Sequence, residues 1–306
     1  MKILFFGLGS IGKRHMNILK KDSDHEIYAY SKSNHRVEGV TYVNSLDNLE
    51  TYNFDFAIIS NPTSEHVKYA TICAESKINL FIEKPLSHTL DNVDKLISLC
   101  NDNEIHLYVA YNMRFHPIID WIKNNIKETD VQHVSITASS YLPHWRPAAN
   151  HRLSYSSHKH MGGGVILDLS HEIDYARYLF GESTILAAIS DRTGSVTVDS
   201  EDTADIILKT KYCYINMHLD YTSFIKKRFI TIQTPQCTVH ADLIKETIDI
   251  QTESAHKTIK FEKGMEQSYK QQMATYITNI KEGKVSDYSE TVDVFKQIIS
   301  IRDGAL

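Results

Sequence analysis

The sequence predicts an α/β protein of two domains, in which a doubly wound parallel sheet is followed by an α/β domain with an open, largely antiparallel sheet. Up to about residue 117, short apolar runs alternate with helical patterns, as expected when parallel strands are joined by right-handed crossovers. Residues 184–260 instead show mostly strand patterns. A length of 306 residues also favours two domains over one.

The first domain is expected to span residues 1–117. Its predicted strands cover residues 3–6, 27–30, 56–59, 80–82 and 107–110. Helical spacing predicts two crossover helices between them, one through Ile11, His15, Ile18 and Leu19, the other through Val93, Leu96, Ile97 and Cys100.

The second domain is expected to span residues 118–306, with the boundary near Pro117. A helix is predicted at 118–126, a strand at 133–138, and a single helix at 164–180 after a long polar loop. Farther on, alternation puts Cys213, Ile215, Met217 and Leu219 on one strand face and Tyr214, Asn216, His218 and Asp220 on the other. Two closing helices, at 269–280 and behind Ser286-Asp287 at 289–301, could pack back on the first domain.

Composition favours a small-molecule ligand. The formal net charge of −5 provides no basic field for nucleic acid or an anionic membrane. The widely spaced cysteines, Cys73, Cys100, Cys213 and Cys237, indicate neither a disulfide framework nor a zinc site. Because the sequence contains neither a signal-peptide core nor a membrane-length apolar run, we expect a soluble, unprocessed cytoplasmic protein.

Three glycines follow the first predicted strand. Gly7 allows a tight turn, Gly9 lets backbone N–H groups approach a pyrophosphate, and Gly12 lets the next helix pack close to the strand. Ser10 and Ile11 lie at the helix start, whose positive end favours phosphate. The alternative is a glycine-rich turn without a ligand. The strand-to-helix context favours a Rossmann domain that binds a dinucleotide.

The end of the second strand bears on the choice of nicotinamide. The acid that would hold the ribose 2′-hydroxyl of NAD is missing there. Hydroxyls and cations stand in its place, at Ser31, Lys32, Ser33 and Arg36, and these groups suit a 2′-phosphate. The sequence therefore favours NADP(H) over NAD(H), although an ordinary solvated basic loop explains the same residues.

Glu83-Lys84-Pro85 directly follows a predicted strand, at the carboxyl edge where doubly wound folds bind ligands. The Lys84 ammonium could polarise a carbonyl or stabilise an alkoxide, with Glu83 positioning the lysine or the cofactor. Taken alone, the tripeptide also suits a solvated strand end.

A glycine-rich segment, Gly162 to Gly164, leads into the predicted helix 164–180. Asp168, His171 and Asp174 recur every three residues, along one flank of that helix. A histidine beside a carboxylate can serve as general acid or base, but a merely structural hydrogen bond explains it equally well. No metal site is predicted, because one aspartate and one histidine leave the coordination sphere short.

In this order the motifs resemble the glucose-fructose oxidoreductase, inositol dehydrogenase and MocA family over nearly the whole chain. Asn61-Pro62-Thr63-Ser64-Glu65-His66 resembles the family's cofactor loop, and Tyr111-Asn112-Met113-Arg114-Phe115 its domain-junction motif. The resemblance implies that the cofactor contacts Asn61, Pro62, Thr63, His66, Glu83, Lys84, Asn112 and Arg114.

The same resemblance implies catalytic roles for Lys84, His171 and Asp168. Lys84 would contact the nicotinamide region and the substrate hydroxyl, His171 would exchange the proton, and Asp168 would bind or orient the substrate. Many members place the histidine four residues after the aspartate, whereas His171 is three after Asp168. The resemblance also implies that the open sheet of the second domain mediates assembly into a homodimer or homotetramer.

A substrate pocket is predicted from Tyr141, Trp145, Arg146 and Arg152, which can stack on a sugar and bind a carboxylate or phosphate. This segment resembles members from surface-polysaccharide and nonulosonic-acid biosynthesis, and a subunit contact is the alternative use. The expected activity is hydride transfer between nicotinamide and a hydroxyl or keto carbon of a sugar-type substrate. Two other hypotheses are a nicotinamide-using glycosidase without net redox and a non-catalytic dinucleotide sensor.

Overall fold

The computed structural model describes residues 1–22, 25–31, 36–145, 150–284 and 288–304. The chain divides into two compact units, unit 1 with Met1–Tyr111 and Tyr269–Phe295, and unit 2 with Asn112–Ser268 and Lys296–Leu306. The chain crosses between the units within its last two helices, α7 (Gly264–Lys281) and α8 (Ser289–Asp303). The chain first passes from unit 1 to unit 2 between Tyr111 and Asn112, a few residues before the Pro117 boundary expected from the sequence.

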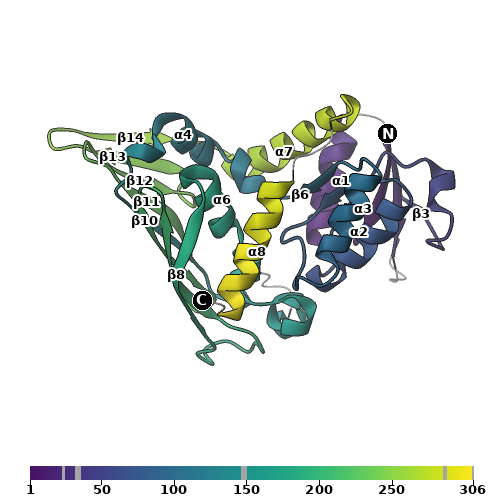
Figure 1. Ribbon diagram of the computed structural model, residues 1–306, viewed down its shortest axis with the longest axis horizontal. Helices are drawn as coiled ribbons and strands as arrows, with labels where there is room; N and C mark the ends of the chain where they lie inside the picture. The colour runs from purple at the N-terminus through teal and green to yellow at the C-terminus, as the bar shows by residue number, and fades with distance from the viewer. Residues whose placement is uncertain (23–24, 32–35, 146–149, 285–287, 305–306) are drawn as a thin grey trace. The chain divides into compact units, whose positions relative to one another are not determined.

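Unit 1 is built on a six-stranded sheet in the order β3-β2-β1-β4-β5-β6, with every neighbouring pair parallel (Figure 1). This order is that of a Rossmann fold, whose ligands bind where the strand order reverses, beside β1. The strands are β1 (Lys2–Phe6), β2 (Glu26–Tyr30), β3 (Thr41–Tyr42), β4 (Phe56–Ile59), β5 (Asn79–Ile82) and β6 (Leu107–Val109).

Helices cover this sheet and complete the core of unit 1. They are α1 (Ser10–Asp22), α2 (His66–Glu75), α3 (Val93–Asp102) and the parts of α7 and α8 that belong to this unit. Strand residues such as Phe5, Phe56 and Phe81 are fully buried against Leu19 of α1 and Tyr276 of α7. Strand β3 and helix α2 are not among the elements predicted from the sequence.

Unit 2 is built on an eight-stranded sheet in the order β14-β13-β12-β11-β7-β10-β9-β8 (Figure 1). Only β7 and β10 run parallel; the other neighbours are antiparallel. The strands are β7 (His133–Ser139), β8 (Ser183–Asp191), β9 (Thr203–Thr210), β10 (Tyr214–Asp220), β11 (Lys227–Gln233), β12 (Thr238–Asp242), β13 (Thr247–Gln251) and β14 (His256–Lys260).

One face of this sheet is covered and the other is open. On β10, Ile215, Met217 and Leu219 are buried, whereas Tyr214 and Asn216 are exposed, as the alternation predicts. The helices of this unit are α4 (Pro117–Asn125), α5 (Val165–Asp168), α6 (His171–Phe180), the start of α7 and the end of α8. The predicted fold class, a parallel Rossmann sheet plus an α/β domain with a largely antiparallel sheet, is confirmed.

The prediction of one helix over 164–180 is wrong. Helix α5 ends at Asp168 and α6 begins at His171, with Leu169 and Ser170 between them. The two pieces have different partners, because α5 lies on β9 and β10 whereas α6 packs against α4. Because Leu169 and Ser170 interrupt the helix, Asp168 and His171 do not share a helix flank.

Within the described ranges, no helix combines the length and apolar character needed to cross a membrane.

A buried ion pair fastens α6 to the sheet. The Arg228 guanidinium of β11 donates to both carboxylate oxygens of Glu172, at 2.7 and 3.1 Å, and Glu172 has no exposed surface. The Tyr175 hydroxyl also donates to this carboxylate, at 3.4 Å. A buried carboxylate is tolerated only when it is paired in this way.

We expect Arg228→Met to destabilise the protein by about 3 kcal/mol, because it leaves the Glu172 carboxylate buried without its cation. The matched control is Glu182→Gln, which removes the exposed partner of Arg177 and should cost about 0.5 kcal/mol or less. Urea unfolding followed by circular dichroism measures both variants. Equal losses of stability in the two would contradict this interpretation of the pair.

Candidate active site

The glycine loop after β1 is shaped by backbone contacts that leave no room for side chains. Gly7 has φ of +92°, and a Cβ there would lie 2.7 Å from the Asn61 nitrogen. A Cβ on Gly12 would lie 2.2 Å from the Gly7 carbonyl oxygen. Gly9 is different, because a Cβ there meets nothing within 4 Å. The open space beside Gly9 is what the approach of a pyrophosphate requires.

The loop is braced from the neighbouring strand by Ser60, a residue that the sequence analysis missed. Its hydroxyl donates to the Gly7 carbonyl at 2.7 Å, and its backbone N–H donates to the Phe6 carbonyl at 2.8 Å. Helix α1 then begins at Ser10, with Ile11 and Gly12 in its first turn and no acidic residue there. These features fit a dinucleotide phosphate at the positive end of α1.

At the end of β2, the structure describes only part of the predicted 2′-phosphate site. The Arg36 guanidinium stacks over the Tyr42 ring, 4.1 Å from its centroid. Ser31 directly follows the strand. Lys32 and Ser33 lie outside the described residues.

Glu83 and Lys84 follow β5 at the same sheet edge as Gly7. Pairing of Phe6 with Ile59, and of Ile59 with Ile82, aligns the ends of β1, β4 and β5. The Glu83 carboxylate accepts a 2.6 Å bond from Nε2 of His15, which is fully buried on α1. It also accepts, at 3.3 Å, from the Lys84 backbone N–H. His15 thus holds the backbone that presents Lys84.

The loop after β4 is fastened to the loop after β5 by His66. Its ring nitrogens lie 2.9 Å from the Pro85 carbonyl and 3.0 Å from the Asn61 carbonyl. Burial lowers the pKa of His66. Pro62 and Thr63 lie between these contacts. The predicted cofactor loop therefore has a fixed shape, in which the His66 ring binds backbone.

In unit 2, Asp168 receives a hydrogen bond that the sequence did not reveal. The Tyr221 hydroxyl, just beyond β10, donates to Oδ2 of Asp168 at 2.7 Å, and both residues are buried. Burial and the neighbouring carboxylate raise the pKa of Tyr221 well above its usual range. The phenol consequently remains a donor, which fixes the orientation of Asp168.

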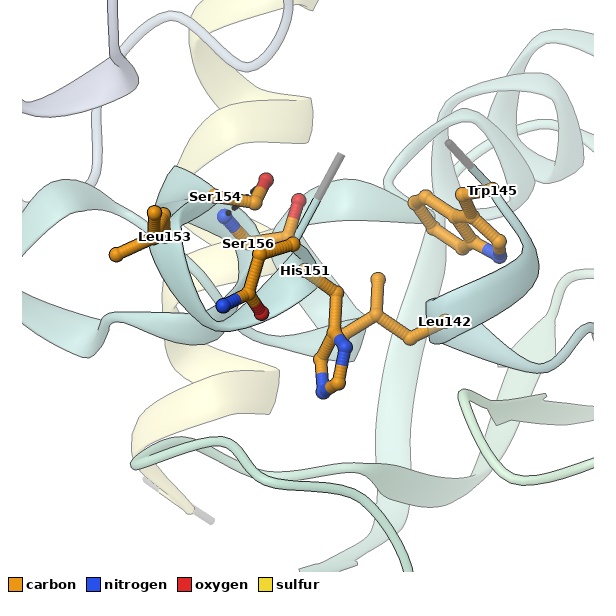
Figure 2. Close-up of a pocket in the computed structure, with 7 residues that line it drawn as sticks. Leu142, Trp145, His151, Leu153, Ser154 and Ser156 are labelled. Carbon is orange, nitrogen blue, oxygen red and sulfur yellow. Dashed lines mark hydrogen bonds between the residues drawn. The ribbon is translucent and has the colours of Figure 1, made fainter. Parts of the chain in front are cut away.

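Trp145 continues this network. Its ring meets the Tyr221 ring edge-on at 5.3 Å, and its indole N–H donates to Ser140 at 2.7 Å. Trp145 also lines a pocket with Leu142, Asn150, His151, Leu153, Ser154 and Ser156 (Figure 2).

The other predicted pocket residues are placed differently. Tyr141 packs against Phe224, with ring centroids 4.6 Å apart, and against His144. Arg152 is exposed, and its carbonyl accepts a bond from His158. Arg146 lies outside the described residues. Of the four residues predicted to form a substrate pocket, Trp145 is therefore the one that lines this pocket among the described residues.

Arg114 and Asn112 have partners within unit 2. The Arg114 guanidinium pairs with Asp174 at 2.7 Å and stacks on Tyr178, which commits Asp174 to an ion pair. The Asn112 amide donates to the Ser268 hydroxyl at 2.7 Å.

His171, the first residue of α6, is 8% exposed, and Asp168 is 6% exposed. An imidazole and an oriented carboxylate so close in the chain can exchange a proton with a bound hydroxyl and hold a second polar group.

The parallel strand order and the dinucleotide loop of unit 1 are those of a nicotinamide-dependent oxidoreductase. Two family models match the chain: "Oxidoreductase family, NAD-binding Rossmann fold" over residues 1–111 and "GFO/IDH/MocA C-terminal domain" over residues 129–242. The chain belongs to the GFO/IDH/MocA family of oxidoreductases.

Individual relatives agree with this assignment. The myo-inositol 2-dehydrogenase of Thermotoga maritima is 28% identical over 93% of this chain and 89% of its own. The scyllo-inositol 2-dehydrogenase (NADP(+)) of Bacillus subtilis is 25% identical over 47% of this chain and 44% of its own. In fold, the chain resembles the UDP-N-acetylglucosamine 3-dehydrogenase of Acidithiobacillus ferrooxidans, with a TM-score of 0.82, 17% identity, and coverage of 99% and 97% of the two chains.

The contrast between two glycines gives a direct test of the dinucleotide loop. We expect Gly9→Ala to fold normally but to bind NADPH at least about tenfold more weakly, because the methyl group takes the space beside the pyrophosphate and costs a charge-assisted hydrogen bond. Gly12→Ala should instead lose about 1–3 kcal/mol of stability, since its Cβ collides with backbone. Thermal unfolding and fluorescence titration separate the two effects. Unaltered NADPH affinity in a folded Gly9→Ala protein would contradict the assignment.

Proposed function

We propose that this chain transfers a hydride between NADP(H), preferred over NAD(H), and a hydroxyl or keto carbon of a sugar or sugar derivative. The common sheet edge that carries Gly7, Ser60 and Glu83-Lys84 is the observation that supports it most directly. At this edge the dinucleotide-binding loop follows β1 and Lys84 follows β5, with only β4 between the two strands, an arrangement that suits hydride transfer to a carbonyl.

Each proposed residue has a distinct task. When bound, nicotinamide supplies hydride exchange with the substrate carbon. In oxidation His171 accepts the hydroxyl proton as the carbon becomes a carbonyl, and in reduction it returns that proton. The Lys84 ammonium stabilises the charge that develops on the substrate oxygen, and Asp168, oriented by Tyr221, binds a neighbouring hydroxyl.

The remaining proposed contacts concern the cofactor. Gly7, Gly9 and Gly12, with Ser10 and Ile11, hold the pyrophosphate, and Ser31 and Arg36 hold the 2′-phosphate. Further proposed cofactor contacts come from the loop residues Asn61, Pro62, Thr63 and His66, and from Asn112 and Arg114.

The proposed substrate is a sugar or polyol derivative, with surface-polysaccharide and nonulosonic-acid precursors as the more specific class. The aromatic surface of Trp145 suits a sugar ring, because apolar ring faces stack on indole while hydroxyls bond to polar neighbours. The similarity to inositol dehydrogenases supports the broader class, that of polyhydroxylated rings.

We also propose that two copies associate through the open face of the unit 2 sheet. Leu186, Ile189, Ile207 and Tyr214 lie exposed on the adjacent strands β8, β9 and β10. An apolar patch of this kind marks an association surface. The mass of the particle in light scattering tests this proposal, since a monomer at micromolar concentration contradicts it.

We expect NADPH to bind more tightly than NADH, because the Arg36 guanidinium can pair with the 2′-phosphate. Arg36→Ala should weaken NADPH binding about tenfold, the scale of one charge-assisted hydrogen bond, and leave NADH binding unchanged. Fluorescence titration of folded, cofactor-free protein measures both constants, and NADH serves as the internal control. Tighter NADH binding would overturn the preference, and failure to bind either cofactor would overturn the function itself.

We expect Lys84→Ala and His171→Ala each to reduce turnover at least about a hundredfold while sparing cofactor affinity, the usual scale for losing an acid–base group. The matched controls are Lys257→Ala and His256→Ala, on exposed positions of β14, which should retain normal turnover. Steady-state rates on a panel of sugars and inositols, with both cofactors, provide the measurement. Normal turnover in both site variants would exclude the proposed mechanism.

A further inference from the structure

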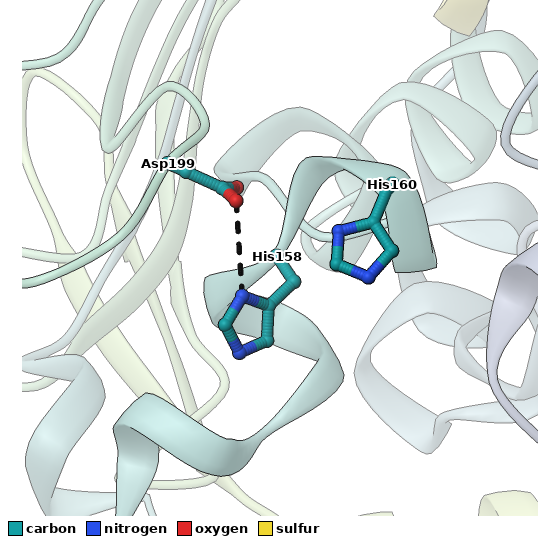
Figure 3. A group of neighbouring side chains, drawn as sticks. All are labelled: His158, His160 and Asp199. Atoms are coloured by element: carbon teal, nitrogen blue, oxygen red, sulfur yellow. Dashed lines mark ion pairs between the residues drawn. The ribbon is translucent and has the colours of Figure 1, made fainter.

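Three side chains of unit 2 bring potential metal ligands together, and none of them is among the residues assigned a role above. His158 and His160 lie on the turn before Gly162, and Asp199 lies between β8 and β9 (Figure 3). One ligand atom of each lies within 4.8 Å of the others. We propose that His158, His160 and Asp199 bind a divalent transition-metal ion of the zinc type.

The hydrogen bond of His158 determines which ring nitrogen faces the cluster. Nε2 lies 2.8 Å from the Arg152 carbonyl oxygen, which can only accept, so Nε2 carries the hydrogen. In the neutral ring the lone pair is then on Nδ1, which lies 3.7 Å from Oδ2 of Asp199. Metal-binding histidines are commonly oriented by such a bond to a backbone carbonyl.

The facing atoms of His158 and Asp199 suit a cation between them. A lone pair on Nδ1 and a carboxylate oxygen repel each other, and 3.7 Å is too long for a good hydrogen bond. The spacing suits two ligands of one ion, since bonds of about 2.1 Å at the tetrahedral angle separate ligand atoms by about 3.4 Å. A protonated ring paired with Asp199 is the competing arrangement, and the experiment below distinguishes the two.

The donor set indicates the class of metal. Two imidazoles and one carboxylate suit zinc and its neighbours, whereas calcium and magnesium prefer oxygen ligands throughout. The Lys159 backbone N–H donates to Oδ1 of Asp199, which directs Oδ2 toward the histidines. The His160 ring completes the group, with its centroid 5.6 Å from that of His158. Three protein ligands leave a fourth position for water.

An ion bound by these three residues would fasten the segment that leads to helices α5 and α6. The His158 carbonyl accepts from the Gly163 N–H at 3.0 Å, and the Asp199 N–H donates to the Ser157 carbonyl at 3.1 Å. The metal would therefore tie the turn before the glycines to the loop before β9. Because an ion that binds only the folded state stabilises it, zinc should raise the melting temperature.

The test is a calorimetric titration of tag-free, EDTA-treated protein with zinc chloride. We expect one equivalent to bind saturably, and His160→Gln or Asp199→Asn to weaken binding at least about tenfold. His160→Gln leaves the bond from His158 to Arg152 in place. The matched control is His256→Gln, since His256 pairs with Asp249 at 3.4 Å but belongs to no three-ligand group in the described part of the chain.

Cobalt(II) provides a second measurement on the unmodified protein, because a four-coordinate site gives intense visible absorption at one equivalent. Absence of a one-equivalent site for zinc and cobalt overturns the proposal and leaves His158 and Asp199 as an ion pair. Equal zinc affinity in His160→Gln, Asp199→Asn and unmodified protein, each folded by circular dichroism, also overturns it, since the ion then binds other histidines.

Discussion

The close approach of helix α1 to the end of β1 determines the architecture of unit 1. A Cβ on Gly12 would lie 2.2 Å from the Gly7 carbonyl oxygen, a distance that backbone atoms cannot relieve without moving the helix. The same carbonyl accepts a bond from Ser60, at the end of the next strand in the sheet. The turn at Gly7, the start of α1 and the end of β4 therefore constrain one another's positions. The positive end of α1 opens beside Gly9, where no side chain intrudes.

In unit 2, side-chain contacts between distant segments of the chain hold the helices in place. Helices α5 and α6 carry three buried acids within seven residues, an arrangement that burial alone would strongly disfavour. Each acid has a partner from a distant segment: Asp168 pairs with Tyr221, Glu172 with Arg228, and Asp174 with Arg114. These contacts hold the two helices in place: α5 lies on β9 and β10, whereas α6 packs against α4 and is joined to β11 through Glu172 and Arg228.

Local patterns were sufficient to predict most of the fold. Alternation and glycine spacing identified five of the parallel strands, the dinucleotide loop and the buried face of β10, because each depends on neighbours in sequence. What depends on partners far along the chain was not predicted. Tyr221 lies 53 residues after Asp168 and Glu83 lies 68 residues after His15, and nothing local marks either pair. The helix break has the same origin, since the apolar spacing of 164–180 does not encode two different packing partners.

The same limit of sequence-based prediction applies to the candidate site. Sequence could propose Lys84, Asp168 and His171 as candidates, because they lie in motifs, but it could not predict which of them is held by a long-range hydrogen bond. Tyr221 stays protonated over the working range of pH, so Asp168 always accepts one fixed hydrogen bond and suits the binding of a hydroxyl. A group that both takes and returns a proton near neutrality is still required, and imidazole has that property. If Asp168 keeps this one role, as proposed, proton exchange falls to His171. The Lys84 backbone is held by the Glu83 carboxylate, which in turn accepts a bond from His15.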